Sequence, residues 1–326
     1  MTRLLEVLDL RTSFYTRRGV VKAVQGVSFS LDKGETIGLV GESGCGKTIT
    51  CLSILRLVPK PAGRIVGGQI LFEGADLVQE REDQMRKIRG RKISMILQDP
   101  MSSLNPAFTI GDQVGETIVQ HQGIRGAKLW EKVKELFRLV RIPSAETTIR
   151  YYPHQISGGM RQRVVGAICI SCQPQLLIAD EPTTSLDVTI QAQYLKLLKD
   201  VQQQLGVAMI FITHDLGIVA QMCDKVAVMY AGKIVESADT RELFNNPVHP
   251  YTVALLRSLP RIDVRVDRLY SIEGQPPSLI ELPLGCAFSP RCEHAMEGCA
   301  REIPPTINVR DGHVVRCGLS RRVPHG

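Results

Sequence analysis

The segment GESGCGKT at residues 41–48 constrains the fold of this 326-residue chain more strongly than any other stretch. It matches the phosphate-binding pattern G-x-x-x-x-G-K-[ST] at every fixed position. The run before it, IGLV, is apolar, as in a buried strand. The residues after it place apolar side chains at helical spacing, at Ile49, Leu52, Leu55 and Val58. A strand, a glycine-rich turn and a helix in this order predict an α/β domain that binds a nucleotide.

The residue types in this turn suit a triphosphate with Mg²⁺. Gly44 and Gly46 carry no side chain that would keep a phosphate away from the backbone, and the amides of the turn and of the helix N-terminus point at the anion. Lys47 adds an ammonium for the outer phosphates, and Thr48 offers a hydroxyl to Mg²⁺. We therefore expect the loop to bind the nucleotide through Gly41, Ser43, Gly44, Cys45, Gly46, Lys47 and Thr48.

A second apolar run, LLIADEP, ends in two carboxylates, Asp180 and Glu181. Asp180 is placed to hold Mg²⁺, directly or through water. Glu181 can polarise the water that attacks the γ-phosphate, because a carboxylate beside Mg²⁺ and phosphate stays ionised. On its own, a DEP segment is an ordinary end of a strand. Together with the phosphate loop, it favours a catalytic pair.

The order of sequence patterns along the chain predicts its domains. Strand-like segments dominate at the start, helical patterns run from about Ser102 to Tyr152, and strand–helix alternation resumes after Ile156. That alternation predicts a parallel sheet covered by helices, the α/β class. From residue 245 Pro and Gly increase, as in a loop-rich appendage. The predicted domains are a nucleotide-binding domain, a helical subdomain within it and a C-terminal domain, at residues 1–244, about 102–160 and 245–326.

Composition limits the location and the partners of the chain. Hydrophobic content of 44% and charged content of 22% are those of a folded soluble protein. The apolar runs are too short to span a bilayer, and the charged N-terminus does not read as a secretory signal, so we expect a cytosolic chain with reduced thiols. The net charge of +7 is not gathered in a Lys/Arg block, which favours a solvated basic surface without a nucleic-acid partner.

Three further segments narrow the class of nucleotide enzyme. ILQDP places Gln98 at the end of a strand, and FITHD places His214 at the end of another. ISGGMRQRV puts Ser157 and two glycines directly before an amphipathic helix, which makes a second backbone site for an anion. Each segment alone is a weak signal, because a strand-end histidine is usually packed and SGG is usually a turn.

The order of these motifs resembles the ATPase subunits of ATP-binding-cassette (ABC) transporters. The resemblance runs through the phosphate loop, Gln98, SGG, LLIADEP, SLD and His214, and covers the chain to about Ala238. It implies a P-loop NTPase fold with a RecA-like core, an antiparallel β subdomain and a helical subdomain. It also implies that two such domains face each other and close on two ATP molecules. The helical region would receive the membrane subunits.

The same resemblance implies roles for residues outside the phosphate loop. Gln98 would contact Mg²⁺ and the attacking water, and His214 would hold the γ-phosphate. Tyr15 would stack on adenine, with Phe14 as the alternative. The residues expected to act across the dimer interface are Ser157, Gly158, Gly159 and Asp187.

The signature segment departs from the family pattern at two positions. Met160 stands where a Gln is usual, and Ile156 stands where a Leu is usual. The backbone donors need only Ser and Gly, so we expect the segment to bind phosphate without the missing amide.

The C-terminal segment NNPVHPYTVALLRSLP resembles the tail of one subgroup, the ATPase subunits of importers for oligopeptides, dipeptides and sometimes nickel. Four cysteines follow it, separated by five, six and seventeen residues: Cys286, Cys292, Cys299 and Cys317. In a reducing compartment, grouped thiols favour metal ligands over disulfides. The wide gaps suit a [4Fe–4S] cluster, which the resemblance also implies, whereas zinc sites usually contain close C-x₂₋₄-C pairs.

Other interpretations of these thiols stay open: a Zn²⁺ site, or free or disulfide-bonded cysteines. His294 and His313 could serve zinc but are expected at the surface. We expect the cluster to staple a tail too small for a core of its own; redox sensing is the alternative.

Together these observations predict an ATP-hydrolysing subunit of a peptide importer, peripheral on the cytoplasmic face of the inner membrane. The resemblance implies a second ATPase chain of different sequence, two transmembrane subunits and an external substrate-binding protein. The alternatives are the same machine importing nickel or another small solute, and an ABC ATPase that is not coupled to transport.

Overall fold

The computed structural model of the chain describes residues 3–99, 103–184, 186–259 and 270–319. Two features of the sequence prediction lie outside these residues, namely the start of the helical region near Ser102 and Ser185 of the SLD segment. Within the described residues, no helix combines the length and the hydrophobicity needed to cross a bilayer.

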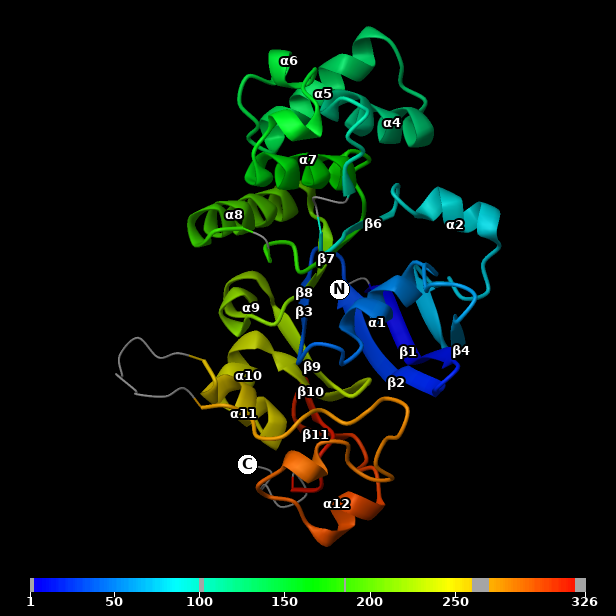
Figure 1. Cartoon of the computed structure of the whole chain (residues 1–326), viewed down its shortest axis with the longest axis vertical. Helices are drawn as coiled ribbons and strands as arrows, with labels where there is room; N and C mark the ends of the chain where they lie inside the picture. Colours follow the sequence, from blue (N-terminus) through cyan, green and yellow to red (C-terminus); the bar gives the residue numbers. More distant parts are fainter. Residues whose placement is uncertain (1–2, 100–102, 185, 260–269, 320–326) are drawn as a thin grey trace. The chain divides into compact units, whose positions relative to one another are not determined.

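The chain forms two compact units (Figure 1). The unit that carries residues 41–48, called here the phosphate-loop unit, consists of Leu5–Leu31, Thr36–Val78 and Ile212–Gly326. The other, called here the helical unit, consists of Met1–Leu4, Asp32–Glu35 and Gln79–Phe211.

A four-stranded sheet forms the N-terminal part of the phosphate-loop unit. Its strands, in the order β2-β1-β4-β5, are Gly19–Asp32, Arg3–Thr16, Gly63–Phe72 and Ala75–Asp76. β4 runs antiparallel to both β1 and β5. The alternating apolar residues of β1 face the core until the register shifts between Leu8 and Arg11, where Asp9 has a φ of 48°. The shift is a β-bulge, which lets one long strand bury different faces along its length.

A second sheet of this unit carries the phosphate loop. Strand β3 (Thr36–Val40), which leads into the loop, pairs in parallel with β9 (Lys225–Tyr230). All of β3 is buried, as the unbroken apolar sequence predicts for a strand covered on both faces. Beyond β9 the sheet continues antiparallel through β10 (Lys233–Asp239), β12 (His313–Val315) and β11 (Ile307–Arg310).

This arrangement corrects two expectations. The sheet is parallel only in part, because β9 and β10 form a hairpin whose tight turn, with positive φ at Ala231 and Gly232, returns the chain directly. The C-terminal region also contributes more than loops, since β11 and β12 extend the sheet. It adds the helices α11 (Pro250–Arg257) and α12 (Glu297–Arg301) and the 3₁₀ turn η2 (Ser289–Arg291).

The helix after the phosphate loop is shorter than its apolar spacing predicts. α1 spans Lys47–Ile54, so Leu55 and Val58 lie beyond its end. Arg56 has a φ of 51°, in the left-handed region, and Pro59 disfavours helical backbone at the residue before it. Leu55 and Val58 are still buried, so the apolar spacing predicted correctly which side chains lie in the core but not where the helix ends.

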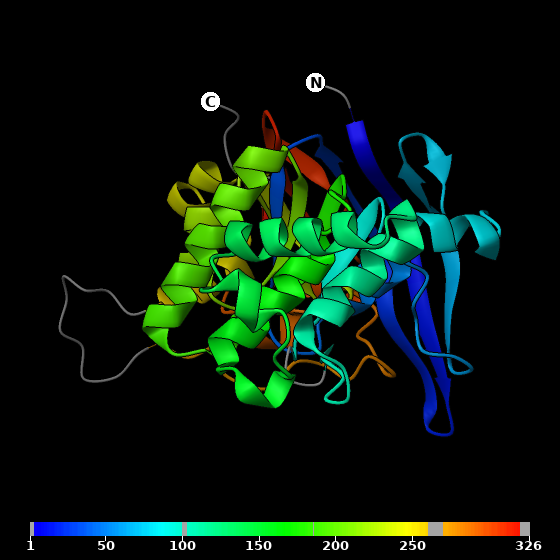
Figure 2. The same ribbon diagram turned by 90° about the horizontal axis from the view of Figure 1, so that it is seen from above.

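The helical unit contains the predicted helical region. Its strands β8 (Ala208–Ile212), β7 (Leu176–Asp180) and β6 (Ile93–Ile96) lie in that order, with β6 and β7 parallel. The helices are α2 (Glu82–Ile88), α4 (Ile110–Gln122), α5 (Ala127–Leu139), α6 (Ala145–Thr148), the 3₁₀ turn η1 (Pro153–Gln155), α7 (Gly158–Ile170) and α8 (Val188–Leu205). α7 packs against β6 and against α4, α5 and α8, and Figure 2 shows the green helices stacked on one another.

Two helices pack on the strands of the second sheet of the phosphate-loop unit. α9 (Leu216–Met222) packs on β3, and α10 (Thr240–Asn245) packs on β9 and β10. A Cβ on Gly38 of β3 would lie 3.0 Å from the Val219 side chain, so the glycine lets α9 approach the strand closely.

Candidate nucleotide site

The glycines that open and close the phosphate loop are required by its backbone. Gly41 has a φ of 148°, and a Cβ there would lie 2.2 Å from the Met229 carbonyl oxygen. Gly46 has a φ of 105°, and a Cβ there would lie 2.4 Å from the Ala23 carbonyl oxygen. Another residue at either position would force the neighbouring strand away. The loop is therefore fixed in a tight curve.

Lys47 lies inside this curve. Its side chain is buried, and Nζ donates to the carbonyl oxygens of Gly41 at 2.7 Å and Glu42 at 3.0 Å. The loop thus holds an ammonium group at the N-terminus of α1, where backbone N–H groups already favour an anion. Ser43 and Gly44 at the tip of the loop are exposed, and Thr48 in the first turn of α1 is half-buried.

Cys45 is the one thiol in the loop. Burial raises the pKa of the Cys45 thiol, although the adjacent Lys47 ammonium opposes this effect. The thiol is therefore neutral at ordinary pH and acts as a small apolar side chain.

The helical unit brings Gln98 and Glu181 together. Asp180, the last residue of β7, is buried, and Glu181 follows with a φ of 44°. Glu181 Oε2 accepts hydrogen bonds from Gln98 Nε2 at 3.1 Å and from Thr184 Oγ1 at 3.0 Å. Two donors thus orient the carboxylate that the sequence predicts as the base.

The SGG segment and Asp187 begin two neighbouring helices. Ser157 caps α7, its hydroxyl accepting from the Met160 N–H at 3.3 Å, and Asp187 caps α8 by accepting from the Ile190 N–H at 3.0 Å. A Cβ on Gly159 would lie 2.8 Å from the Ile190 side chain, so the two helix starts are in contact. Gly158 is exposed with open space around it, as a phosphate approaching the backbone requires.

Tyr15 and His214 lie in the phosphate-loop unit. Tyr15, near the end of β1, is 51% exposed, and the Arg64 guanidinium carbon lies 5.6 Å from the centre of its ring. Phe14 is half-buried opposite Gly63. His214 is exposed two residues after the end of β8. Of the two aromatic candidates, Tyr15 is the more accessible to a base.

The four tail cysteines are present as thiols and not as disulfides. Cys286 donates its N–H to the Cys299 carbonyl oxygen at 2.7 Å. Burial raises the pKa of the Cys286 and Cys292 thiols, and nearby thiols raise both further. Cys317 is buried. Within the described residues, no three His, Cys, Asp or Glu side chains are arranged to hold a metal ion.

The expectation that His313 lies at the surface is wrong. His313 is fully buried in β12, and its Nε2 lies 2.8 Å from Oε1 of Glu236, a fully buried residue of β10. Burial lowers the pKa of His313, but its hydrogen bonds with Glu236 and Glu242 outweigh this effect and raise it. The pair joins the tail strand to the sheet, which a lone histidine in the sequence does not reveal. His294 is exposed, as expected.

A contact that the sequence analysis missed links the phosphate loop to the tail. The Arg291 guanidinium forms two hydrogen bonds with the Glu42 carboxylate, at 2.7 and 2.9 Å. Tyr251 Oη accepts from the Glu42 N–H at 2.8 Å. Glu42 occupies a variable position of the loop pattern, so the motif does not single it out. The sequence offers only an arginine next to Cys292 in SPRC, and nothing local pairs that arginine with Glu42.

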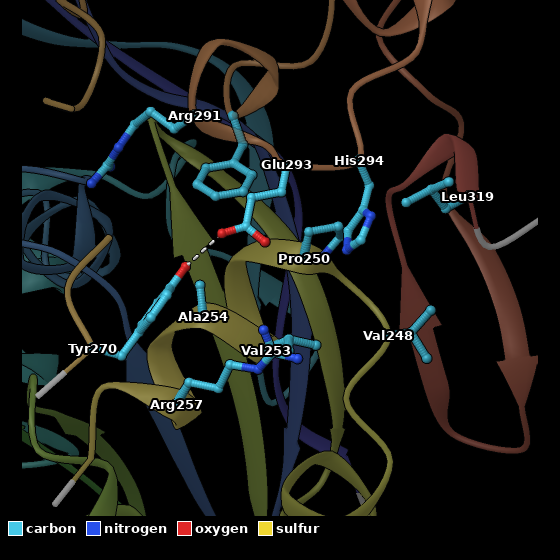
Figure 3. Close-up of a pocket in the computed structure, with 11 residues that line it drawn as sticks. Val248, Pro250, Val253, Ala254, Arg257, Tyr270, Arg291, Glu293, His294 and Leu319 are labelled. Carbon is cyan, nitrogen blue, oxygen red and sulfur yellow. Dashed lines mark hydrogen bonds between the residues drawn. The ribbon is translucent and has the colours of Figure 1, made fainter. Parts of the chain in front are cut away.

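Residues of the tail line several cavities of the phosphate-loop unit, and two of these lie beside the phosphate loop or α11. One, of about 180 Å³, lies between residues 42–45 of the phosphate loop and Pro276, Pro277 and Leu279. The other, of about 290 Å³, lies between α11 and later residues of the tail, where Tyr270 donates to Glu293 at 3.3 Å (Figure 3). The second cavity includes none of the residues predicted for nucleotide chemistry.

Comparison with known proteins identifies the family. A family model described as "ABC transporter" matches residues 24–184, and one described as "Oligopeptide/dipeptide transporter, C-terminal region" matches residues 235–299. The probable peptide ABC transporter ATP-binding protein y4tR of Sinorhizobium fredii is 50% identical over 98% of this chain and 96% of its own length. The chain belongs to the ABC transporter ATPases of the oligopeptide/dipeptide family. The dipeptide transport ATP-binding protein DppD of Bacillus subtilis is 48% identical to this ABC ATPase over 100% of the chain and 97% of its own length.

Solved structures agree on the fold. The dimeric ATP-binding cassette MJ0796, in a post-hydrolysis state with ADP and Pi, superposes with a TM-score of 0.65 at 21% identity, covering 73% of this ABC ATPase and 99% of that chain. CbiO1 of Clostridium perfringens, part of the ABC transporter complex cbiONQ, gives a TM-score of 0.64 at 25% identity, covering 76% of this chain and 92% of that one. The predicted fold class, the family and the ATPase assignment are thus confirmed.

Proposed function

We propose that this ABC ATPase drives the uptake of dipeptides or oligopeptides through a membrane transporter. The observation that carries the proposal is full-length similarity: proteins named for dipeptide and oligopeptide transport are 48–50% identical over 98–100% of the chain. The match of the tail to the oligopeptide/dipeptide C-terminal model supports the same cargo.

The phosphate loop is proposed to bind ATP. Its tight glycine curve, the buried ammonium of Lys47 and the N-terminus of α1 directly after the loop fit a chain of phosphates. Mg²⁺, when bound with ATP, would neutralise charge on the outer phosphates. Thr48, Asp180 and Gln98 supply oxygen ligands of the kind that Mg²⁺ prefers.

Hydrolysis is proposed to use the Gln98–Glu181 pair. Glu181 would take a proton from the attacking water, and Gln98, whose amide already donates to Glu181, would orient both. His214 would donate to the γ-phosphate, and Tyr15 would stack on adenine through its exposed ring. These roles rest on the family resemblance and on the local geometry around each residue.

A partner subunit is proposed to complete each ATP site. Ser157, Gly158, Gly159 and Asp187 would face the nucleotide bound by a second ATPase chain, which we propose to be of different sequence. The exposed backbone at Gly158 supports this role. Two transmembrane subunits and an extracytoplasmic substrate-binding protein would complete the transporter, with this chain on the cytoplasmic face of the inner membrane.

The chain is proposed to function as two domains. Residues 1–244 would form the nucleotide-binding domain, with the helical subdomain at about 102–160 receiving the transmembrane subunits. Residues 245–326 would form the domain specific to this family, and the tail model at residues 235–299 supports that assignment.

The tail thiols are proposed to hold a [4Fe–4S] cluster. Zinc sites usually contain close C-x₂₋₄-C pairs, and the tail cysteines are more widely separated along the sequence. A cubane cluster instead takes one thiolate at each of four separate corners, which suits the neighbouring Cys286, Cys292 and Cys299 with Cys317 as the fourth. When bound, the cluster would crosslink the tail, because its ligands come from separate short segments.

Reconstitution tests the proposed cargo. The chain is purified with the membrane subunits that accompany it, placed in liposomes with their binding protein, and supplied with Mg-ATP inside and labelled peptide outside. We expect peptide to accumulate and to raise ATP hydrolysis. Accumulation of Ni²⁺ with no response to peptides would contradict the proposal for peptides while retaining an ATP-driven importer.

A further inference from the structure

The Arg291 side chain of the tail is almost completely buried and forms an ion pair with Glu42 of the phosphate loop. Its side chain is only 5% exposed, and its partner Glu42 is 27% exposed. An arginine has five N–H donors in a planar fork. Nη1 donates to Glu42 Oε2 at 2.7 Å and to Tyr230 Oη at 3.2 Å, and Nη2 donates to Glu42 Oε1 at 2.9 Å.

The remaining donors of Arg291 bind the tail backbone. Nη2 donates to the Ile272 carbonyl at 3.3 Å, and Nε donates to the Glu273 carbonyl at 2.9 Å. All five donors are thus used, and they join the phosphate loop, the end of β9 and the segment at residues 272–273. In Figure 3 the Arg291 side chain extends away from His294 and Leu319, which line the same cavity of about 290 Å³.

Glu42 is held from a second direction by α11. The Tyr251 hydroxyl accepts from the Glu42 N–H at 2.8 Å, and the ring of Tyr251 is fully buried. That ring packs edge-on against Tyr230 at 4.6 Å and near Phe288 at 5.3 Å between centroids. Two parts of the tail, the HPYT segment and the SPRC segment, therefore converge on the second residue of the phosphate loop.

The charge of Glu42 gives this contact a consequence for ATP. Glu42 is adjacent to Gly41 in the loop, and its carbonyl oxygen lies 3.0 Å from the Lys47 ammonium. A free carboxylate at this position would repel the phosphates and compete for Lys47. Arg291 neutralises the carboxylate and holds it in a fixed direction through two parallel hydrogen bonds.

We propose that Arg291 is a positioning residue for nucleotide binding, acting through Glu42 from the C-terminal tail. The tail is then part of the ATP site, because it sets both the charge and the order of the phosphate loop. The inference rests on the proposed binding of ATP at residues 41–48 and adds a residue that no phosphate-loop motif contains.

Equilibrium binding of a fluorescent ATP analogue with Mg²⁺ to the full-length chain tests the proposal. Arg291→Met should raise Kd about tenfold, because it leaves the Glu42 carboxylate unpaired beside the phosphates. Arg291→Lys should restore only part of the affinity, since a single ammonium cannot replace a planar fork with five donors. Arg301→Met, which removes an exposed tail ion pair with Glu297, is the matched control and should leave Kd unchanged.

The double variant Arg291→Met/Glu42→Gln separates positioning from simple tail stability. If Arg291 acts through the charge of Glu42, removing that charge should bring Kd back to within about threefold of the wild type. If Arg291→Met acted only by loosening the tail, losing a second contact would not restore the affinity. Wild-type-like affinity of Arg291→Met, or a loss of affinity that Glu42→Gln does not correct, would overturn the inference alone. A wild-type chain that binds no nucleotide would overturn the proposed function and this inference with it.

Discussion

At the scale of single residues, Glu181 carries the sharpest chemical prediction. Its left-handed backbone and two donors fix the direction of one carboxylate oxygen. Glu181→Gln keeps the shape and an oxygen acceptor, but an amide cannot take a proton from water. We expect ATP to bind as in the wild type while steady-state hydrolysis falls at least about 100-fold, as removal of a general base predicts.

Filter binding of labelled ATP and phosphate release measure the two effects separately. Glu297→Gln, which changes an exposed carboxylate of α12 in the same way, is the control and should hydrolyse ATP normally. Hydrolysis by Glu181→Gln at more than a tenth of the wild-type rate would mean that another group accepts the proton.

Residues with fixed positions in a motif could be predicted from the sequence, and residues that act through distant partners could not. Gly41, Gly46 and Lys47 were predicted because phosphate binding dictates their spacing, and Gly41 and Gly46 have the positive φ values that only glycine adopts readily. Glu42 was missed because its partner Arg291 is 249 residues away. A pairing over that distance follows from the fold and leaves no local pattern.

At the scale of elements, the start of α11 depends on a neutral histidine. His249 caps the helix, Nδ1 accepting from the Tyr251 N–H at 3.1 Å. Burial lowers the pKa of His249 to about 4, although Glu236 of β10 opposes this effect. A protonated Nδ1 could no longer accept the hydrogen bond. The helix start is therefore built for the uncharged ring.

This cap predicts a loss of stability in acid. The folded pKa of His249 lies below the ordinary value near 6.5, so its contribution is complete above pH 6.5 and falls as the pH drops toward 4. Between pH 7.5 and pH 5 this one group should remove about 2 kcal/mol from the free energy of unfolding. His313, whose pKa is raised, changes stability in the opposite direction, because its contribution is lost as the pH rises.

Urea unfolding at both pH values, compared between the wild type and His249→Asn, isolates the effect. Asparagine can cap a helix but does not titrate, so the variant should lose about 2 kcal/mol less than the wild type over this range. Equal pH dependence in the two proteins would show that His249 is not the group responsible.

Element boundaries mark where periodicity stops being a guide. The apolar spacing after the phosphate loop predicted burial correctly at Leu55 and Val58, yet α1 ends at Ile54 because Arg56 turns into the left-handed region. Likewise the Pro-rich tail looked loop-like, although β12 completes its pairing with β10 through the buried His313–Glu236 pair. In both cases tertiary contacts decided what the local pattern left open.

At the scale of the whole molecule, the fold class followed from the order of strands, helices and motifs, whereas the docking of the tail did not. Strand–helix alternation predicted the α/β architecture because the spacing of apolar residues within each segment distinguishes a strand from a helix. The tail was predicted as an appendage, but its contacts with Glu42 and Glu236 attach it to the phosphate loop and to the central strands of its unit. Only three-dimensional pairing reveals that a C-terminal segment is part of the core.

The tail thiols test whether this attachment depends on a metal cluster. Cys286→Ala removes one proposed ligand, so we expect loss of bound iron and faster proteolysis of the chain beyond residue 245, because a staple that orders short segments acts as folding energy. Iron content and the rate of limited trypsin digestion measure the two effects. Cys172→Ala, which changes a half-buried thiol of the helical unit, should alter neither. If the Cys286 variant kept its iron-free tail as resistant as the wild type, the thiols would serve something other than structure, and the Arg291 and His313 contacts alone would be sufficient to hold the tail in place.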